Sequence, residues 1–377
     1  MRPGVVPLAL ALMACKTDVS DPTGFGTQGQ VVTGAPAGVV GIAAGYEGVL
    51  WTNGASIEYC PRQGCAAWTS VYTTSGGIAR MVADDANVYW TEVFDVTTDA
   101  GSTPEATVWW CPQTGCTPDQ GAIYVAEPGT IADPTNTPPD YGFLALDGGN
   151  LYWSVVRSSV LFLETCQVPG CSGYASYSVD PSVAPGLLPR LVHDGVLYAT
   201  QKSGNGISAL VSCPASAPAG GGAIVCSAPT TVAGGIFDVH AAVIDGATLY
   251  FDAYVADTEQ ESVYSCPLPC TTPTPLFPSI WPGFAVQGGN LFTAARSPSG
   301  TTGFANCVVS SCSPSGPQLL DLPFDFVQFD QLVPAPSIVP DAHGAGAYAY
   351  ALYDIPNDGV GLTPGISAIV YLPNPTP

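Results

Sequence analysis

Twelve of the thirteen cysteines occur as six close pairs, and each pair follows a stretch rich in aromatic and β-branched residues. A unit that recurs along a chain is typical of a repeat architecture. The regular placement of these pairs therefore predicts a fold built from repeated β-sheets. The pairs are Cys60 and Cys65, Cys111 and Cys116, Cys166 and Cys171, Cys213 and Cys226, Cys266 and Cys270, and Cys307 and Cys312.

Seven copies of one strand pattern accompany these cysteines. Each copy contains an apolar strand, a tight turn marked by Asp-Gly, Gly-Asn or a relative, and a second strand with an aromatic pair or a vestige of one. A third strand ends in the cysteine pair, and a fourth follows in most copies. The copies begin at Gly38, Ile78, Gly142, Pro189, His240, Gly283 and Ser337, the last being the most degenerate.

The two ends of the repeat array complement each other. The seventh copy ends with the strand Ser367 to Pro373 and is one strand short, whereas Gln30 to Thr33 forms a strand with no unit of its own. An N-terminal strand that completes the last sheet closes a β-propeller and removes its exposed edges. We therefore predict an all-β fold, a seven-bladed β-propeller closed by an N-terminal strand. A six-bladed ring is the alternative if the seventh copy is not a blade, and an open sandwich or two small barrels fits the equal spacing less well.

The motifs resemble the NHL, YWTD and related propeller superfamilies. Val88 to Thr91 reads VYWT and Leu151 to Ser154 reads LYWS, and each follows a turn containing Asp with Gly or Asn. The chain also resembles bacterial lipoproteins that carry such repeats with added cysteine pairs. This resemblance covers nearly all of the chain after its leader and implies a fold, but it implies no substrate.

The cysteine spacing favours disulfides over metal sites. Four residues separate Cys60 from Cys65, including a proline and a glycine suited to a turn, so a hairpin can bring the two sulfurs together. Zinc sites usually show C-x2-C with further ligands nearby, which this chain lacks. We predict six structural disulfides, no metal and no cofactor, with a calcium ion in the channel or a loop left open.

The N-terminus predicts a lipid anchor. Arg2 and the apolar run Val5 to Ala14 resemble a signal peptide, and Leu12 to Cys15 matches a bacterial lipobox. We assign residues 1–14 to the signal peptide, 15–29 to a lipid-anchored linker and 30–377 to the propeller. Acylation of Cys15, with palmitate among its acyl chains, would attach the protein to a lipid bilayer in the cell envelope. Lys16 favours the outer membrane by resemblance to better-known lipoproteins.

Charge excludes one class of partner. The sequence has 8 Lys and Arg against 30 Asp and Glu, a formal charge of −22. Such a surface repels phosphate backbones, so we expect no nucleic-acid partner. We also predict a monomer.

Few residues offer catalytic chemistry. Nucleophile-elbow, zinc-protease, phosphate-loop and EF-hand patterns do not occur. The histidines adjoin first strands and could converge on the central channel near Asp194 or Asp341, although turn capping explains them more simply. Two acidic pairs are weak calcium candidates that also suit solvated turns. The histidines are His193, His240 and His343. The acidic pairs are Asp84 with Asp85 and Asp95 with Asp99.

Loop length distinguishes the two faces of the predicted ring. The connections between strands one and two and between three and four are short or disulfide-clamped, whereas those on the opposite face are long. The long segments are Asp95 to Glu105, Thr130 to Tyr141, Tyr174 to Leu188, Tyr254 to Glu261, Phe277 to Pro282, Pro323 to Ala335 and Asp354 to Gly365. The aromatic residues on them form a candidate binding face: Phe94, Tyr141, Tyr177, Tyr254, Trp281, Phe326 and Phe329.

These features predict a non-enzymatic, lipid-anchored propeller that recognises a protein or glycan. The alternative is a propeller hydrolase, lactonase or lyase that uses channel carboxylates and a metal. A structural assembly factor is a third interpretation.

Overall fold

A computed structural model describes most of the propeller region and none of residues 1–29. Among the described residues there is no α-helix, and none of the secondary structure could cross a membrane as a long apolar helix. The described residues are 30–35, 39–45, 48–61, 67–98, 101–116, 122–125, 143–157, 160–184, 186–202, 208–216, 224–255, 260–278, 283–296, 302–312, 320, 338–340, 346–353 and 366–373.

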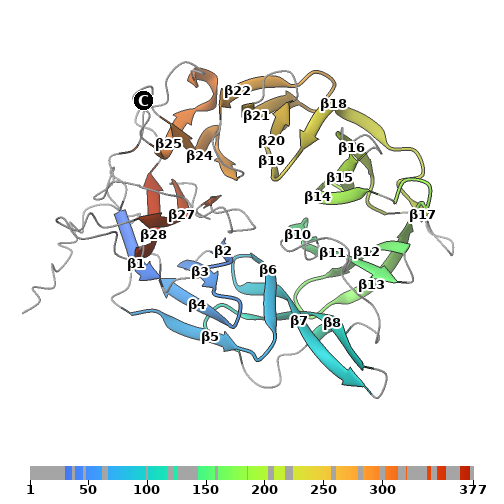
Figure 1. The fold of residues 1–377 in the computed structure, drawn as a ribbon, viewed down its shortest axis with the longest axis vertical. Helices are drawn as coiled ribbons and strands as arrows, with labels where there is room; N and C mark the ends of the chain where they lie inside the picture. Colours follow the sequence, from blue (N-terminus) through green and yellow to red (C-terminus); the bar gives the residue numbers. More distant parts are fainter. Residues whose placement is uncertain are drawn as a thin grey trace, which may run out of the picture.

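The strands follow the chain in successive units around a central opening (Figure 1). The first three units are β2(Gly41–Ala44), β3(Gly48–Thr52), β4(Ser56–Pro61) and β5(Thr69–Thr73); β6(Gly77–Ala83), β7(Asn87–Thr98), β8(Gly101–Pro112) and β9(Ala122–Val125); and β10(Leu144–Asp147), β11(Asn150–Arg157), β12(Val160–Gln167) and β13(Ser172–Val179).

The remaining units complete the ring and include a single short 3-10 helix among the described residues. They are β14(Leu187–His193), β15(Val196–Lys202), β16(Ser208–Pro214), β17(Ile224–Val225) and β18(Thr230–Asp238); β19(Ala242–Asp245), β20(Thr248–Val255), β21(Gln260–Pro267) and β22(Thr274–Pro278); β23(Phe284–Gln287), β24(Asn290–Arg296), β25(Thr302–Val308) and η1(Val309–Ser311); and β26(Ile338–Pro340), β27(Gly346–Tyr353) and β28(Ile366–Pro373) with β1(Gln30–Ala35).

The all-β propeller prediction is confirmed. The described strands form six hydrogen-bonded sheets, which is the number in the six-bladed alternative. One of these sheets has eight strands because β18 of one unit pairs with β20 of the next, joining Ile236 to Val255 and Asp238 to Tyr254. The first strands contact one another in the cyclic order β2, β6, β10, β14, β19, β23, β26 and back to β2. The described ring therefore has seven innermost strands, although two of its units share one sheet.

The N-terminal strand closes the ring, as predicted. In Figure 1, β1 lies against β28, and the two strands pair antiparallel from Gln30 opposite Tyr371 to Ala35 opposite Ser367. The weak seventh copy is thus a sheet of three strands that β1 completes. Since the first strands β26 and β2 are also in contact, this pairing fastens the two ends of the array together.

Two connections that we predicted as long loops are strands instead. Residues 95–98 belong to β7 and residues 101–105 to β8, and the ladder between the two strands continues to Thr98 opposite Gly101. Residues 174–179 belong to β13, the fourth strand of its unit, which pairs with β12 and also, in parallel, with β17. Residues 95–105 include Val96 and three threonines, and residues 174–179 include two tyrosines and Val179. These β-branched and aromatic residues favour extended backbone.

The aromatic pairs of the second strands form the core between neighbouring units. Tyr89 packs into a cluster with Trp153 of the following unit, whereas the adjacent Trp90 contacts Tyr72 of the preceding unit, with ring centroids 4.7 Å apart. Successive strand residues point to opposite faces, so one Tyr-Trp pair serves two interfaces. Core packing, rather than a carbohydrate-stacking surface, explains these residues.

The cysteines lie at disulfide distance in five of the predicted pairs. The Cα atoms are between 4.9 and 5.4 Å apart in Cys111–Cys116, Cys166–Cys171, Cys213–Cys226, Cys266–Cys270 and Cys307–Cys312. Cys60 is also disulfide-bonded, and Cys65 lies outside the described residues.

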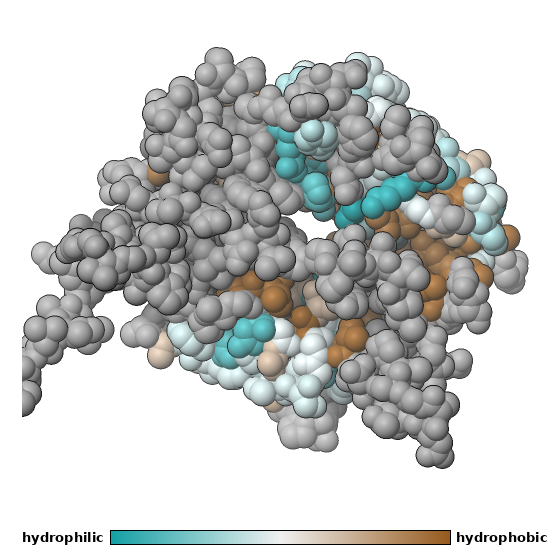
Figure 2. All heavy atoms as spheres, viewed as in Figure 1, coloured by the Kyte–Doolittle hydropathy of each residue, from teal (hydrophilic) through white to brown (hydrophobic). Residues whose placement is uncertain are grey.

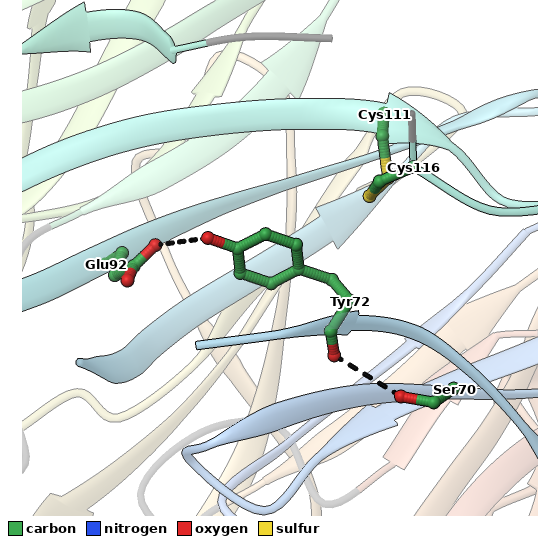
Figure 3. The surroundings of a disulfide bond; sticks show 5 residues. All are labelled: Ser70, Tyr72, Glu92, Cys111 and Cys116. Atoms are coloured by element: carbon green, nitrogen blue, oxygen red, sulfur yellow. Dashed lines mark hydrogen bonds between the residues drawn. A yellow bond between two sulfur atoms is a disulfide. The ribbon is translucent and has the colours of Figure 1, made fainter. Parts of the chain in front are cut away.

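The clamped loops also touch the neighbouring unit. The backbone N–H of Cys116 donates to the carbonyl of Val71 in β5, at 3.3 Å. Figure 3 shows this disulfide close to Tyr72 of β5, whose hydroxyl donates to Glu92 of β7. The Cys111–Cys116 disulfide therefore closes a loop that lies against β5 of the preceding unit.

Candidate functional site: two histidine–carboxylate clusters

The two faces of the ring each carry one cluster of a histidine with two carboxylates. We call the face with the two-residue turns between first and second strands the turn face; it includes Asp194-Gly195 and the disulfide loops. The opposite face, where β19 begins and β20 ends, is called the loop face. Among the described residues, the turn face carries Asp147, His193 and Asp194, and the loop face carries His240, Asp252 and Glu261.

The loop-face cluster is organised around the buried carboxylate of Asp252, which is 1% exposed. Its Oδ1 accepts hydrogen bonds from the backbone N–H groups of His240, at 3.0 Å, and Ala241, at 2.6 Å. Its Oδ2 accepts one from the N–H of Gly283, at 2.9 Å. Asp252 thus fixes the backbone that leads into β19 and into β23.

Burial raises the pKa of the Asp252 carboxyl above its usual range, and the nearby Glu261 adds to this effect. The His240 ring and the backbone N–H donors act in the opposite direction. A fully buried carboxyl that accepts three backbone hydrogen bonds has little capacity left for a ligand. We therefore assign Asp252 a structural role.

The exposed part of this cluster consists of His240 and Glu261. Nδ1 of His240 lies 3.1 Å from Oε1 of Glu261, and the side chains are 39% and 15% exposed. Glu261 in β21 is paired with Tyr254 at the end of β20, and Tyr254 is half-buried. Histidine, carboxylate and phenol therefore occur together at the rim of the loop face.

The turn-face cluster brings together two neighbouring units. His193 ends β14 and Asp147 ends β10, and both occupy the same position, just before a two-residue turn. Nδ1 of His193 lies 3.6 Å from Oδ1 of Asp147, and its Nε2 lies 3.5 Å from Oδ2 of Asp194. Figure 2 shows hydrophilic residues beside the central opening in the region of β14 and β19.

His193 lies at the end of the first strand β14, beside Asp194. Its contact with Asp147 was not anticipated, because the sequence pattern does not show which turns of adjacent units meet. His240 lies at the opposite face and does not join His193. His343 and Asp341 lie outside the described residues.

In the predicted calcium pairs, the side chain of Asp84 makes hydrogen bonds within a turn, and Asp95 lies in a strand. Oδ1 of Asp84 accepts the backbone N–H groups of Ala86 and Asn87, and its Oδ2 accepts the hydroxyl of Tyr89, at 2.7 Å. Asp95 lies within β7, opposite Pro104, and Asp99 lies outside the described residues. Asp84 is therefore a turn-capping residue.

The predicted aromatic face is described only in part. Tyr254 lies at the loop-face end of β20, as expected, whereas Tyr177 lies within β13 and packs against the core next to Leu163. Phe94 belongs to the β7–β8 hairpin. The other predicted members, Tyr141, Trp281, Phe326 and Phe329, and the proposed lipid-attachment residue Cys15 lie outside the described residues.

Sequence reasoning missed Asp252 and Glu261. The available signal was the aligned second-strand motif, which has Ser154 in LYWS and Thr200 in LYAT where LYFD has Asp252. A carboxylate in place of a hydroxyl at a buried position indicates an additional partner. That partner is the Gly283 N–H.

No family model and no curated protein matches this sequence. Solved structures with a similar arrangement include a prolyl endopeptidase, an uncharacterized protein from Listeria monocytogenes and the Dos1 propeller. The prolyl endopeptidase is 12% identical, with a TM-score of 0.49. The match covers 92% of this chain but only 48% of the endopeptidase, so this chain spans about half of its length.

The second is 9% identical with a TM-score of 0.49, covering 85% of this chain and 88% of that one. The third is 10% identical with a TM-score of 0.46, covering 92% of this chain and 95% of that one. At these identities and scores, the assignment of the propeller class rests on the strand pairing described above.

Proposed function

We propose that this protein is a lipid-anchored, non-enzymatic propeller of the cell envelope that binds a protein or glycan through its loop face. In this proposal Cys15 carries the anchor, and the repeats are of the NHL and YWTD type. The bilayer holds the linker, and the rigid ring presents the loop face to its partner.

The observation that supports this proposal most directly is the fixed position of His240, Glu261 and Tyr254 on the loop face. Pairing of β18 with β20 joins two units beside Tyr254, and Asp252 holds the backbone of His240. Side chains on a rigid scaffold lose little freedom when a partner binds, so they contribute more to affinity. A mixture of tyrosine, histidine and carboxylate suits hydrogen bonding with a protein or sugar surface.

Site-specific photo-cross-linking in intact cells tests this proposal. A photoreactive amino acid replaces Tyr254 on the loop face or, as a matched control, Tyr174, which is 47% exposed and lies two residues into β13, beside the disulfide turn of the other face. We expect a discrete adduct from position 254 and none of the same mass from position 174. Mass spectrometry and glycan analysis then identify the partner's class. Identical adducts from both positions, or none from position 254, would contradict the proposal.

Alanine variants provide a second test. For these variants the photoreactive amino acid replaces Ser262, which lies on the same face. Tyr254→Ala and Glu261→Ala should each reduce recovery of the partner cross-linked at position 262 at least tenfold. Ser70→Ala, an exposed change in β5 on another unit, should leave recovery unchanged.

A further inference from the structure

We propose that Asp147, His193 and Asp194 form a binding site for a first-row divalent metal ion such as Zn²⁺, between two neighbouring units on the turn face. This site lies at the opposite end of the strands from the proposed partner-binding residues. It therefore stands or fails independently of the function proposed above.

The spacing of the donor atoms is the first argument. One donor atom from each of the three side chains lies within 4.8 Å of the other two. Metal-to-ligand distances of about 2.0–2.2 Å place neighbouring ligands of a tetrahedral zinc ion roughly 3.4 Å apart. The Asp147–His193 separation of 3.6 Å is close to that edge length, and it is longer than a strong N–H···O hydrogen bond.

The contrast with the loop-face cluster is the second argument. There, Asp252 is saturated by three backbone N–H donors and His240 makes a 3.1 Å contact with Glu261. On the turn face, the two carboxylates approach the His193 ring at 3.5 and 3.6 Å from opposite nitrogens. An ion between Nδ1 and Asp147 would satisfy both groups, and Asp194, whose side chain is 89% exposed, can rotate toward it.

The position of each ligand is the third argument. Asp147 and His193 end equivalent first strands, so the sheet ladders fix their backbones. Asp147 is 16% exposed and His193 is 33% exposed, which leaves one side of the site open to water. An open coordination position of this kind would be occupied by water or by an oxygen ligand.

The ligand set also selects the metal. An imidazole nitrogen favours Zn²⁺ and its first-row neighbours, whereas Ca²⁺ and Mg²⁺ prefer sites made entirely of oxygen. We therefore expect Zn²⁺ and Co²⁺ to bind more tightly than Ca²⁺.

Isothermal titration of the full, oxidised chain with Zn²⁺, Co²⁺ or Ca²⁺ after chelator treatment tests the site. We expect one Zn²⁺ per chain and a visible Co²⁺ absorption band. Asp147→Asn and His193→Gln should each weaken Zn²⁺ binding at least tenfold and remove the band.

Two matched controls distinguish this site from other acidic or histidine positions. Asp245→Asn changes the residue that ends β19, in the position equivalent to Asp147. The Asp245 carboxylate accepts the Gly289 N–H at 2.7 Å. His240→Gln changes the loop-face cluster. Both should retain wild-type Zn²⁺ affinity. Equal affinity in all four variants, tighter binding of Ca²⁺ than Zn²⁺, or no binding to the wild type would each overturn the proposal. Near-ultraviolet circular dichroism confirms that each variant is folded.

Discussion

The carboxylate of Asp252 in β20 accepts the backbone N–H of Gly283, at 2.9 Å, across the boundary between two units of the ring. Its other oxygen accepts the N–H of Ala241, the residue immediately before β19. In an earlier unit, the Ser154 hydroxyl accepts the equivalent bond within its own sheet, from the N–H of Phe143, at 3.0 Å. In the unit that contains β23 and β24, the position aligned with Asp252 is Ala294, which has no acceptor side chain. Asp252 therefore supplies the acceptor for two successive units.

Asp252→Asn should destabilise the protein by about 2 kcal/mol, because the amide NH₂ would face the Gly283 N–H donor and leave it unsatisfied in a buried position. Urea unfolding followed by tryptophan fluorescence measures this loss. Ser154→Ala is the control and should cost about 1 kcal/mol, since it removes one neutral hydrogen bond within one sheet. A smaller loss for Asp252→Asn than for Ser154→Ala would contradict the bridging role.

The stabilities of the wild type and of Asp252→Asn should depend differently on pH. Because burial raises the pKa of Asp252 in the folded state, the native protein retains this proton to higher pH than the unfolded chain. The stability that the protonated group contributes is complete below the usual carboxyl pKa of 3.8 and declines as pH rises through the folded-state pKa. The difference in unfolding free energy between wild type and Asp252→Asn should therefore narrow as the pH rises above 3.8. A difference that widens with pH would contradict the assigned direction.

A second bond between units joins Tyr72 of β5 to Glu92 of β7. The Tyr72 hydroxyl donates to Oε2 of Glu92 at 2.9 Å (Figure 3). The Thr74 hydroxyl donates to the other oxygen of Glu92. Tyr72→Phe should cost about 1 kcal/mol at pH 8, because the buried Glu92 carboxylate loses one donor. Tyr264→Phe, which preserves a ring stacked on Phe251 at 5.4 Å, is the control and should change stability less.

The Tyr72 contribution should disappear in alkali. Burial, followed by the Glu92 contact, raises the pKa of Tyr72 from 10.0 to about 12. The stability due to its protonated hydroxyl is therefore complete below pH 10 and is lost as pH rises toward 12. Thermal midpoints of wild type and Tyr72→Phe should converge over this range, and a constant difference would show that the hydroxyl is not the cause.

Much of this fold could be predicted from sequence, because each unit carries its own strand, turn and cysteine signals. The turn at Asp194-Gly195 and the closing strand at Gln30 are local patterns that need no knowledge of the neighbours. The departures occur where a strand of one unit finds its partner in another. β18 extends past Ala233 to pair with β20, and β17 pairs with β13.

The sites were less predictable for the same physical reason. His193 was identifiable as a residue beside a turn, but its approach to Asp147 depends on how two sheets pack. Asp252 is inconspicuous in sequence, and its role appears only when Gly283 of the next unit is placed beside it. Residue contacts between units depend on packing geometry that a single strand pattern does not contain.

The disulfides should differ in their contributions to stability according to loop length. Cys213 and Cys226 are 13 residues apart in sequence, whereas Cys266 and Cys270 are 4 apart. Loop-closure entropy predicts losses of about 3 and about 2 kcal/mol when each pair is replaced by alanine. Urea unfolding of the two double variants under oxidising conditions measures the order. The reverse order would show that loop-closure entropy does not determine how much each disulfide contributes to stability.

Ring closure by β1 leads to the last prediction. Deleting residues 30–35 removes β1 and leaves the backbone hydrogen-bonding groups on one edge of β28 exposed. Exposed strand edges pair with other chains, so the shortened protein should form oligomers and unfold at lower urea concentration. Light scattering after size exclusion measures the mass, and deletion of residues 17–29, which precede β1, is the control and should remain monomeric. A deletion of 30–35 that stayed monomeric with unchanged stability would show that the pairing of β1 with β28 does not hold the ring closed.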